Sequence, residues 1–165
     1  MNLHHPWLDL DWQRQMQRLL NSYARCVGTE LIDRSGTAEE QAHRLFEVPF
    51  VIVSHGTQAD PILNSANAIA LTLWELPLDQ FLQTPSRLTA EPVHRDERER
   101  MLEQTRRKGY IDDYQGIRIT STGRRFRIDR ATVWNVADEQ GQPAGQAATF
   151  SEWVFIVGDV SEIAV

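Results

Sequence analysis

Aromatic and basic side chains alternate along residues 125–136, near the end of the chain. In a strand every second residue lies on the same face, so one face would carry Phe126, Ile128, Arg130, Thr132 and Trp134. In the preceding segment, Tyr110, Tyr114 and Arg118 share a face in the same way. If both faces point inward, they form an aromatic pocket with arginine donors, which suits the carboxylate of a small organic anion. The candidate ligand contacts are therefore Tyr114, Arg118, Arg130, Thr132 and Trp134.

Two alternatives to this pocket stay open. The aromatic side chains could simply fill the core, while the arginines pair with Asp112, Asp113 or Asp129. A bulge in the strand could also reverse which residues face inward. The two functional hypotheses differ in the interior that they require. A ligand sensor needs a closed cavity on the order of a few hundred Å³, whereas an interaction module has a filled core and an apolar interface.

Three further residues are candidates for the mouth of such a pocket. Arg87 precedes a long charged segment and could reach a ligand, or it could tie its loop to an acidic partner. Asn67 lies where a strand gives way to a helix, a position at which asparagine often bonds local backbone. His55 follows an apolar run and precedes Gly56, so it could be a ligand contact or could hold the turn.

Catalytic and metal-binding patterns are not found in the sequence. The histidines have no paired ligand spacing, and the one cysteine, Cys26, has no second thiol to join it. The chain also lacks a nucleophile elbow, a phosphate loop and a dinucleotide fingerprint. We therefore expect no metal site and no enzymatic activity. The five histidines are His4, His5, His43, His55 and His94.

The elements that must position these residues follow from periodicity and capping. An apolar stripe at spacings of three and four predicts a helix over residues 11–24, and its face must cover either the domain's own sheet or a second copy of the chain. Thr37 and Glu40 have the form of a capping box, and Pro49 ends the helix that follows. The stripe, which we name as a candidate dimer interface, consists of Trp12, Met16, Leu19, Leu20 and Tyr23.

The rest of the chain predicts two strands, a helical middle and three more strands. The strands are expected at residues 50–53, 61–64, 110–120, 125–136 and 146–157, with a long helix from Pro92 to Gly109 between the second and third. This order predicts an α+β fold in which helices cover one face of a five-stranded antiparallel sheet. We expect residues 1–48 to form an N-terminal helical extension that packs on the core or dimerises it, and residues 49–160 to form the core.

The composition of the chain disfavours some classes of binding partner. The chain has 165 residues, 41% of them hydrophobic, and a net charge of −6, which fits one globular domain. The negative charge disfavours nucleic acids and anionic membranes, and no apolar run is long enough to span a bilayer. A single cysteine and no visible signal peptide predict a cytoplasmic protein.

Several segments resemble the MEKHLA domain, a PAS-like family. They are residues 49–57, 60–62 with Asn64 and Asn67, 85–88, 109–114, 123–126, 131–135 and 145–150. The resemblance covers roughly residues 19–157. Because no homeodomain or leucine zipper precedes these residues, the chain resembles the standalone bacterial form of the family. It implies a PAS-like sensory or dimerisation module: a homodimer, with a small organic ligand or a protein partner still to be identified.

The resemblance also limits the cofactors. A photosensor that forms a cysteine adduct with flavin needs a thiol beside the flavin, and Cys26 precedes the PAS-like core. We therefore exclude that chemistry, while noncovalent flavin binding stays open. Haem bound through His55 or His94 is not expected.

Overall fold

Two amphipathic helices open the fold of the computed structural model, which describes residues 1–91 and 95–157. After the short 3-10 helix η1 (Pro6–Leu8), helix α1 (Leu10–Val27) ends at Gly28, whose φ of 89° is the left-handed conformation that glycine adopts freely. Helix α2 (Ala38–Glu47) begins with the predicted capping box: the Glu40 amide donates to Thr37 Oγ1 over 3.1 Å, and the Thr37 amide donates to Glu40 Oε1 over 3.3 Å.

The middle of the chain contains two short strands followed by helices, as predicted. Strands β1 (Val51–His55) and β2 (Leu63–Ala66) pair antiparallel. Helices α3 (Ala68–Trp74) and α4 (Leu78–Phe81) follow, then the 3-10 helix η2 (Ser86–Thr89) and helix α5 (Arg95–Lys108). The start of the long helix, predicted at Pro92, lies outside the described residues.

Four strands complete an antiparallel sheet: β3 (Tyr110–Ile119), β4 (Arg125–Ala137), β5 (Pro143–Phe150) and β6 (Val154–Phe155). The strand order is β2-β1-β5-β4-β3, and β6 pairs with β4. The sequence predicted one final strand over residues 146–157. The structure instead has two, because β5 pairs with the second half of β4, and the chain then crosses to pair Phe155 with Phe126 in the first half.

Two bulges explain why the last strands are irregular. Between the pairs Ile111–Val133 and Tyr114–Ala131, β3 contains one residue more than β4. Between Tyr114–Ala131 and Gly116–Ile128, the extra residue is in β4. Each bulge shifts the alternation of side chains by one position, so residues on the two sides of it exchange faces.

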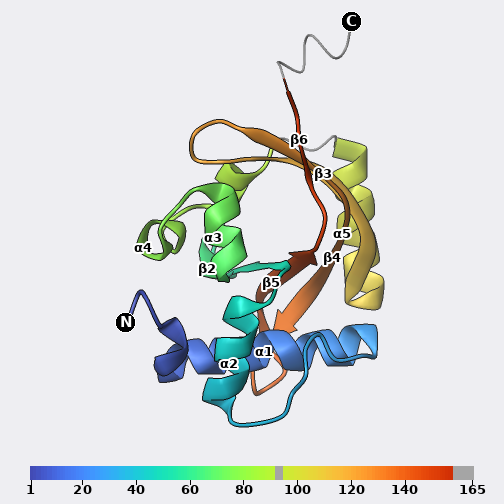
Figure 1. The fold of residues 1–165 in the computed structure, drawn as a ribbon. Helices are drawn as coiled ribbons and strands as arrows, with labels where there is room; N and C mark the ends of the chain where they lie inside the picture. The colour runs from blue at the N-terminus through green and yellow to red at the C-terminus, as the bar shows by residue number, and fades with distance from the viewer. Residues whose placement is uncertain (92–94, 158–165) are drawn as a thin grey trace, which may run out of the picture.

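Helices cover both faces of the sheet, and a hydrophobic core lies on each face. One core lies beneath the middle helices α3 and α4 and includes Val51, Trp74, Phe126 and Phe150. The other core contains Ile52 and Trp134 and lies against α1 and α2. In Figure 1, α1 and α2 lie together below the sheet, with α3 and α4 on one side of it and α5 on the other. The sequence predicted helices on one face and an N-terminal helical extension that packs on the core or dimerises it; in the structure these N-terminal helices cover the second face.

Candidate functional site

Aromatic rings fill the space between the sheet and α3, where the ligand pocket was expected. Trp74 is the centre of this aromatic cluster, with ring centroids 5.4 Å from Phe126, 6.1 Å from Phe81 and 6.2 Å from Phe150. These four side chains are between 0% and 5% exposed. Because rings at these distances are in edge-to-face or tilted contact, the cluster is packed. Two half-buried rings extend it: Phe155, 5.9 Å from Phe126, and Trp153, 5.8 Å from Phe150.

The bulge in β4 separates the residues predicted to line one pocket. Phe126 and Ile128 lie in the same core as Tyr114, but beyond the bulge it is Ala131 and Val133 that continue on this face. Trp134 lies in the opposite core, where its indole N–H donates to the carbonyl oxygen of Leu19 over 3.1 Å. Tyr114 and Trp134 therefore face opposite sides of the sheet.

Arg130 and Thr132 are likewise not brought together with Tyr114. Arg130 is exposed at the bulge and donates from Nε to the Asp112 carbonyl oxygen, over 3.4 Å. Thr132 is half-buried and alternates with Ala131 and Val133, which puts it on the α1 side of the sheet.

Tyr114 and Arg118 do meet. Arg118 Nη2 lies 3.2 Å from the Tyr114 hydroxyl, and its guanidinium carbon lies 5.3 Å from the centre of the ring. Gly116 permits this arrangement, since a Cβ there would lie 2.7 Å from the same hydroxyl. Among the described residues, Arg118 has no carboxylate partner within ion-pair distance.

The three residues predicted at the pocket mouth bond to the protein itself. Arg87 makes an exposed ion pair with Asp60 (3.1 Å), and His55 Nδ1 lies 2.9 Å from the carbonyl oxygen of Gly56. Asn67 is 3% exposed, and its amide bonds three backbone groups. All three contacts match the structural alternatives that the sequence left open.

Two hollows stand out in the described part of the chain, and neither is lined by the aromatic cluster. The first, a cavity of about 10 Å³ between α1, α2 and β2, has room for one water molecule. Trp12 lines it, and its buried indole N–H has no partner among the described residues. The second hollow, of about 110 Å³, is polar and lies between the end of α5 and the start of β3, beside Lys108, Asp112 and Asp113.

The apolar stripe of α1 packs on the sheet of its own chain. Trp12, Met16, Leu19 and Leu20 are between 0% and 5% exposed, in one core with Trp134. The half-buried ring of Tyr23 meets that of Trp134 edge to face, with centroids 5.0 Å apart. Of the two coverings expected for this stripe, the structure has the domain's own sheet, so the residues named as a dimer interface are already occupied.

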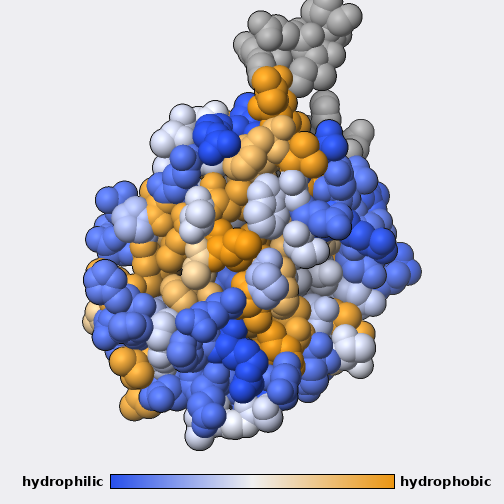
Figure 2. All heavy atoms as spheres, in the orientation of Figure 1, coloured by the Kyte–Doolittle hydropathy of each residue, from blue (hydrophilic) through white to orange (hydrophobic). Residues whose placement is uncertain are grey.

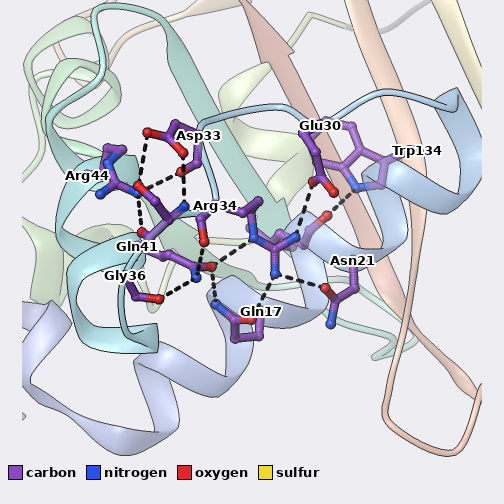
Figure 3. A network of polar contacts seen from close by, with 11 residues as sticks. Gln17, Asn21, Glu30, Asp33, Arg34, Gly36, Gln41, Arg44 and Trp134 are labelled. Carbon is purple, nitrogen blue, oxygen red and sulfur yellow. Dashed lines mark hydrogen bonds and ion pairs between the residues drawn. The ribbon is translucent and has the colours of Figure 1, made fainter.

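A polar network, which the sequence did not predict, ties α1 to α2 (Figure 3). Arg34, in the loop between the helices, donates to Gln17, Asn21 and Gln41 over 2.8–3.0 Å. The Gln41 amide in turn donates to the backbone carbonyls of Arg34 and Gly36. Because these groups satisfy one another, the network fixes the helix pair as a unit. In the sequence, this network is visible only as polar residues on helix faces, and the apolar periodicity predicts that those faces are exposed to solvent.

Among the described residues, the ionisable groups do not form a cluster typical of a metal or reactive centre. The described residues contain no cluster of three or more histidine, cysteine or acidic side chains that could hold a metal ion, and His94 lies outside them. Burial raises the pKa of the Cys26 thiol, which disfavours the reactive thiolate. Within the same part of the chain, no helix combines the length and apolarity that a bilayer span requires.

Comparisons with known proteins agree on the family and the fold. The model of the MEKHLA domain family matches residues 13–155. The structure resembles the PAS domain of a protein from Colwellia psychrerythraea, with a TM-score of 0.56 and 17% identity over 71% of this chain and 95% of that one. It also resembles the light-state dimer of the fungal blue-light photoreceptor Vivid, with a TM-score of 0.51 and 10% identity over 79% and 91% of the two chains. No curated protein matches the sequence. At these identities the structural likeness concerns the fold.

Proposed function

The chain belongs to the MEKHLA domain family and has a PAS-like fold. We propose that it is a non-enzymatic regulatory module whose core is filled by its own side chains and which acts through contacts with other proteins. The observation that carries this proposal is the aromatic cluster around Trp74. It occupies the space between the inner sheet face and the middle helices, where a ligand pocket was expected.

The contacts of the predicted pocket residues support the same function. His55, Asn67, Arg87 and Arg130 each bond to protein groups. A ligand that bonded to these same atoms would have to displace these contacts, and each broken bond would leave a polar group to be satisfied again. The Cys26 thiol lies on α1, which packs against the opposite face of the sheet from the aromatic cluster. This position supports the expectation that no cysteine–flavin adduct forms.

A second candidate function rests on Arg118. This half-buried guanidinium has the Tyr114 hydroxyl as its hydrogen-bond partner and no carboxylate nearby among the described residues. A small organic anion could supply the missing charge. In that case the module would be a sensor whose ligand lies at the edge of the aromatic cluster.

Native mass spectrometry of protein purified from its own host, with an absorption spectrum of the same sample, tests the two functions. We expect the bare polypeptide mass and no band from flavin or haem. A bound organic anion that is retained by the wild type and lost from Arg118→Gln would replace the interaction module with the sensor. Arg87→Gln is the matched control, because Arg87 already has a carboxylate partner in Asp60.

A further inference from the structure

Trp12, on helix α1, carries a buried hydrogen-bond donor that has no acceptor among the described residues. The residue is 5% exposed, and its indole Nε1 makes no hydrogen bond within that part of the chain. The indoles of Trp74 and Trp134 are also buried, yet each donates to a backbone carbonyl, over 3.4 and 3.1 Å. A buried donor without an acceptor costs free energy, so the surroundings of Trp12 must be considered.

The Trp12 ring lines a cavity of about 10 Å³ in the core between the sheet and the N-terminal helices. Figure 2 shows hydrophilic surface over much of α1 and α2, where Figure 1 places them, so the apolar sides of these helices are turned toward the sheet. The helix side of the cavity is accordingly apolar, with Met16 and Leu45 in its lining. Ser65 and Asn67 line it at the end of strand β2.

We propose that this cavity binds one water molecule, which accepts the hydrogen bond of the Trp12 indole and joins helix α1 to the end of strand β2. An indole N–H only donates, so the guest must present an acceptor and cannot be a metal cation. An anion would bring an unpaired charge into a mostly apolar lining, at a large cost, so the guest is neutral. A water needs a cavity on the order of 10–15 Å³, which is the size of this one.

Ser65 and Asn67 supply the further partners that a buried water requires. Ser65 is 1% exposed and its hydroxyl bonds to that of Ser54, while Asn67 is 3% exposed and its Oδ1 accepts from the Ile52 amide over 3.1 Å. A hydroxyl oxygen and an amide oxygen each have two lone pairs, so both retain the capacity to accept from a water. With the Trp12 donor this makes about three bonds, the usual number for a buried water. The bridge adds a polar link to the apolar packing of α1 on the sheet.

A crystal structure with ordered waters resolved tests the site directly. We expect one water at about 2.7–3.2 Å from Trp12 Nε1. The matched control is Trp134 Nε1, which donates to the Leu19 carbonyl and should have no water beside it. An empty cavity, a protein acceptor at Trp12 Nε1, or electron density larger than one water would overturn the proposal. The site lies on the other side of the sheet from the aromatic cluster, so either result leaves the proposed function unchanged.

An isosteric replacement of the indole shows whether its N–H is bonded in solution. A synthetic peptide of residues 1–25 can carry Trp12→3-benzothienylalanine, in which sulfur replaces the N–H, and can be ligated to residues 26–165 at Cys26. If the N–H donates to a water, its loss should lower the Tm by about 2–4 °C relative to the ligated wild type.

An unbonded N–H would give the opposite sign, because replacing an unpaired buried donor with an apolar atom is neutral or stabilising. An unchanged or raised Tm would therefore contradict the water bridge. The control is the same replacement at Trp7, whose ring is half-buried, and it should leave the Tm nearly unchanged. An equal fall for Trp7 would show that sulfur itself destabilises the chain, and it would also count against the bridge.

Discussion

Asn67 was a candidate ligand contact, and its side chain instead joins three segments of the backbone. Its Oδ1 accepts from the Ile52 amide over 3.1 Å, and its Nδ2 donates to the carbonyls of Phe50 (2.7 Å) and Leu45 (3.4 Å). These contacts connect the end of α2, strand β1 and the start of α3. At the residue scale, Asn67 therefore has a structural role in this PAS-like core. Its position in the sequence could not distinguish that role from ligand recognition.

Replacing Asn67 should test this structural role. Asn67→Ala leaves a buried amide and two carbonyls without their partner, so we expect a loss of about 2–4 kcal/mol in the free energy of unfolding. Urea denaturation followed by tryptophan fluorescence measures it. Asn64→Ala, at a half-buried neighbouring asparagine, should cost less. Equal losses for the two variants would show that the three bonds of Asn67 add little.

Gly145 makes a second residue-scale prediction. Its φ is +123°, a conformation that side chains disfavour, and a Cβ there would overlap the carbonyl oxygen of His55 on the neighbouring strand. We expect Gly145→Ala to destabilise the protein by at least about 3 kcal/mol. Gly123→Ala, with φ +87° and open space around it, isolates the backbone strain and should cost about 1 kcal/mol. Comparable thermal shifts for both would contradict the steric overlap.

At the scale of elements, the sequence predicts most helices and strands, because caps and periodicity are local properties. The capping box at Thr37 and the apolar stripe of α1 form as expected. From the sequence, a bulge was one alternative, and the bulge in β4 moves some of the predicted pocket residues to the other face of the sheet. Its signal is that Ile128 and Ala131 are three residues apart, with Asp129 and Arg130 between them, where strict alternation needs a spacing of two. The predicted pocket residues are divided between two faces there, because one extra residue exchanges the two faces of the strand.

The end of α3 supports a prediction about pH. Glu75 ends this helix with φ 59°, and the Thr122 hydroxyl, which donates to its carboxylate over 2.5 Å, holds the pKa of that carboxyl below its ordinary value of 4.5. A lowered pKa in the folded state stabilises the protein above the ordinary value, and this contribution is lost as the pH falls through the lowered one. We expect the Tm of Thr122→Val to fall less than that of wild type between about pH 5 and pH 3.

The control for this pH dependence lies in the same turn. Ser121 Oγ donates to the backbone carbonyl of Glu75 over 2.7 Å, and not to its carboxylate. Ser121→Ala should therefore lower the Tm by a similar amount at every pH in this range. A wild-type profile that is parallel to that of Thr122→Val would show that the carboxylate does not contribute to acid sensitivity.

At the scale of the whole molecule, two cores share one sheet, and this arrangement determines what the module can do. Adjacent residues of β1, Val51 and Ile52, are both at most 2% exposed because helices cover both faces of the sheet. Trp134 is buried between the sheet and helices α1 and α2, and Phe126 and Trp74 are buried between the sheet and helix α3. These filled faces support the proposal that the domain exchanges signals with a partner through its surface.

Removing a ring from the aromatic cluster should create an apolar cavity. Phe126 is 0% exposed and in contact with Trp74 and Phe155, so Phe126→Ala should leave a dry apolar cavity and cost about 3–5 kcal/mol. Such cavities bind small aromatic molecules, and binding to the native state alone raises stability. We therefore expect benzene to raise the Tm of Phe126→Ala and to leave the Tm of wild type unchanged.

Phe155→Ala, at the half-buried edge of the aromatic cluster, is the control: it should leave no enclosed cavity, and benzene should not change its Tm. If benzene stabilises the wild type as much as Phe126→Ala, the core already contains a site for a small ligand, and the sensor becomes the better account of this domain.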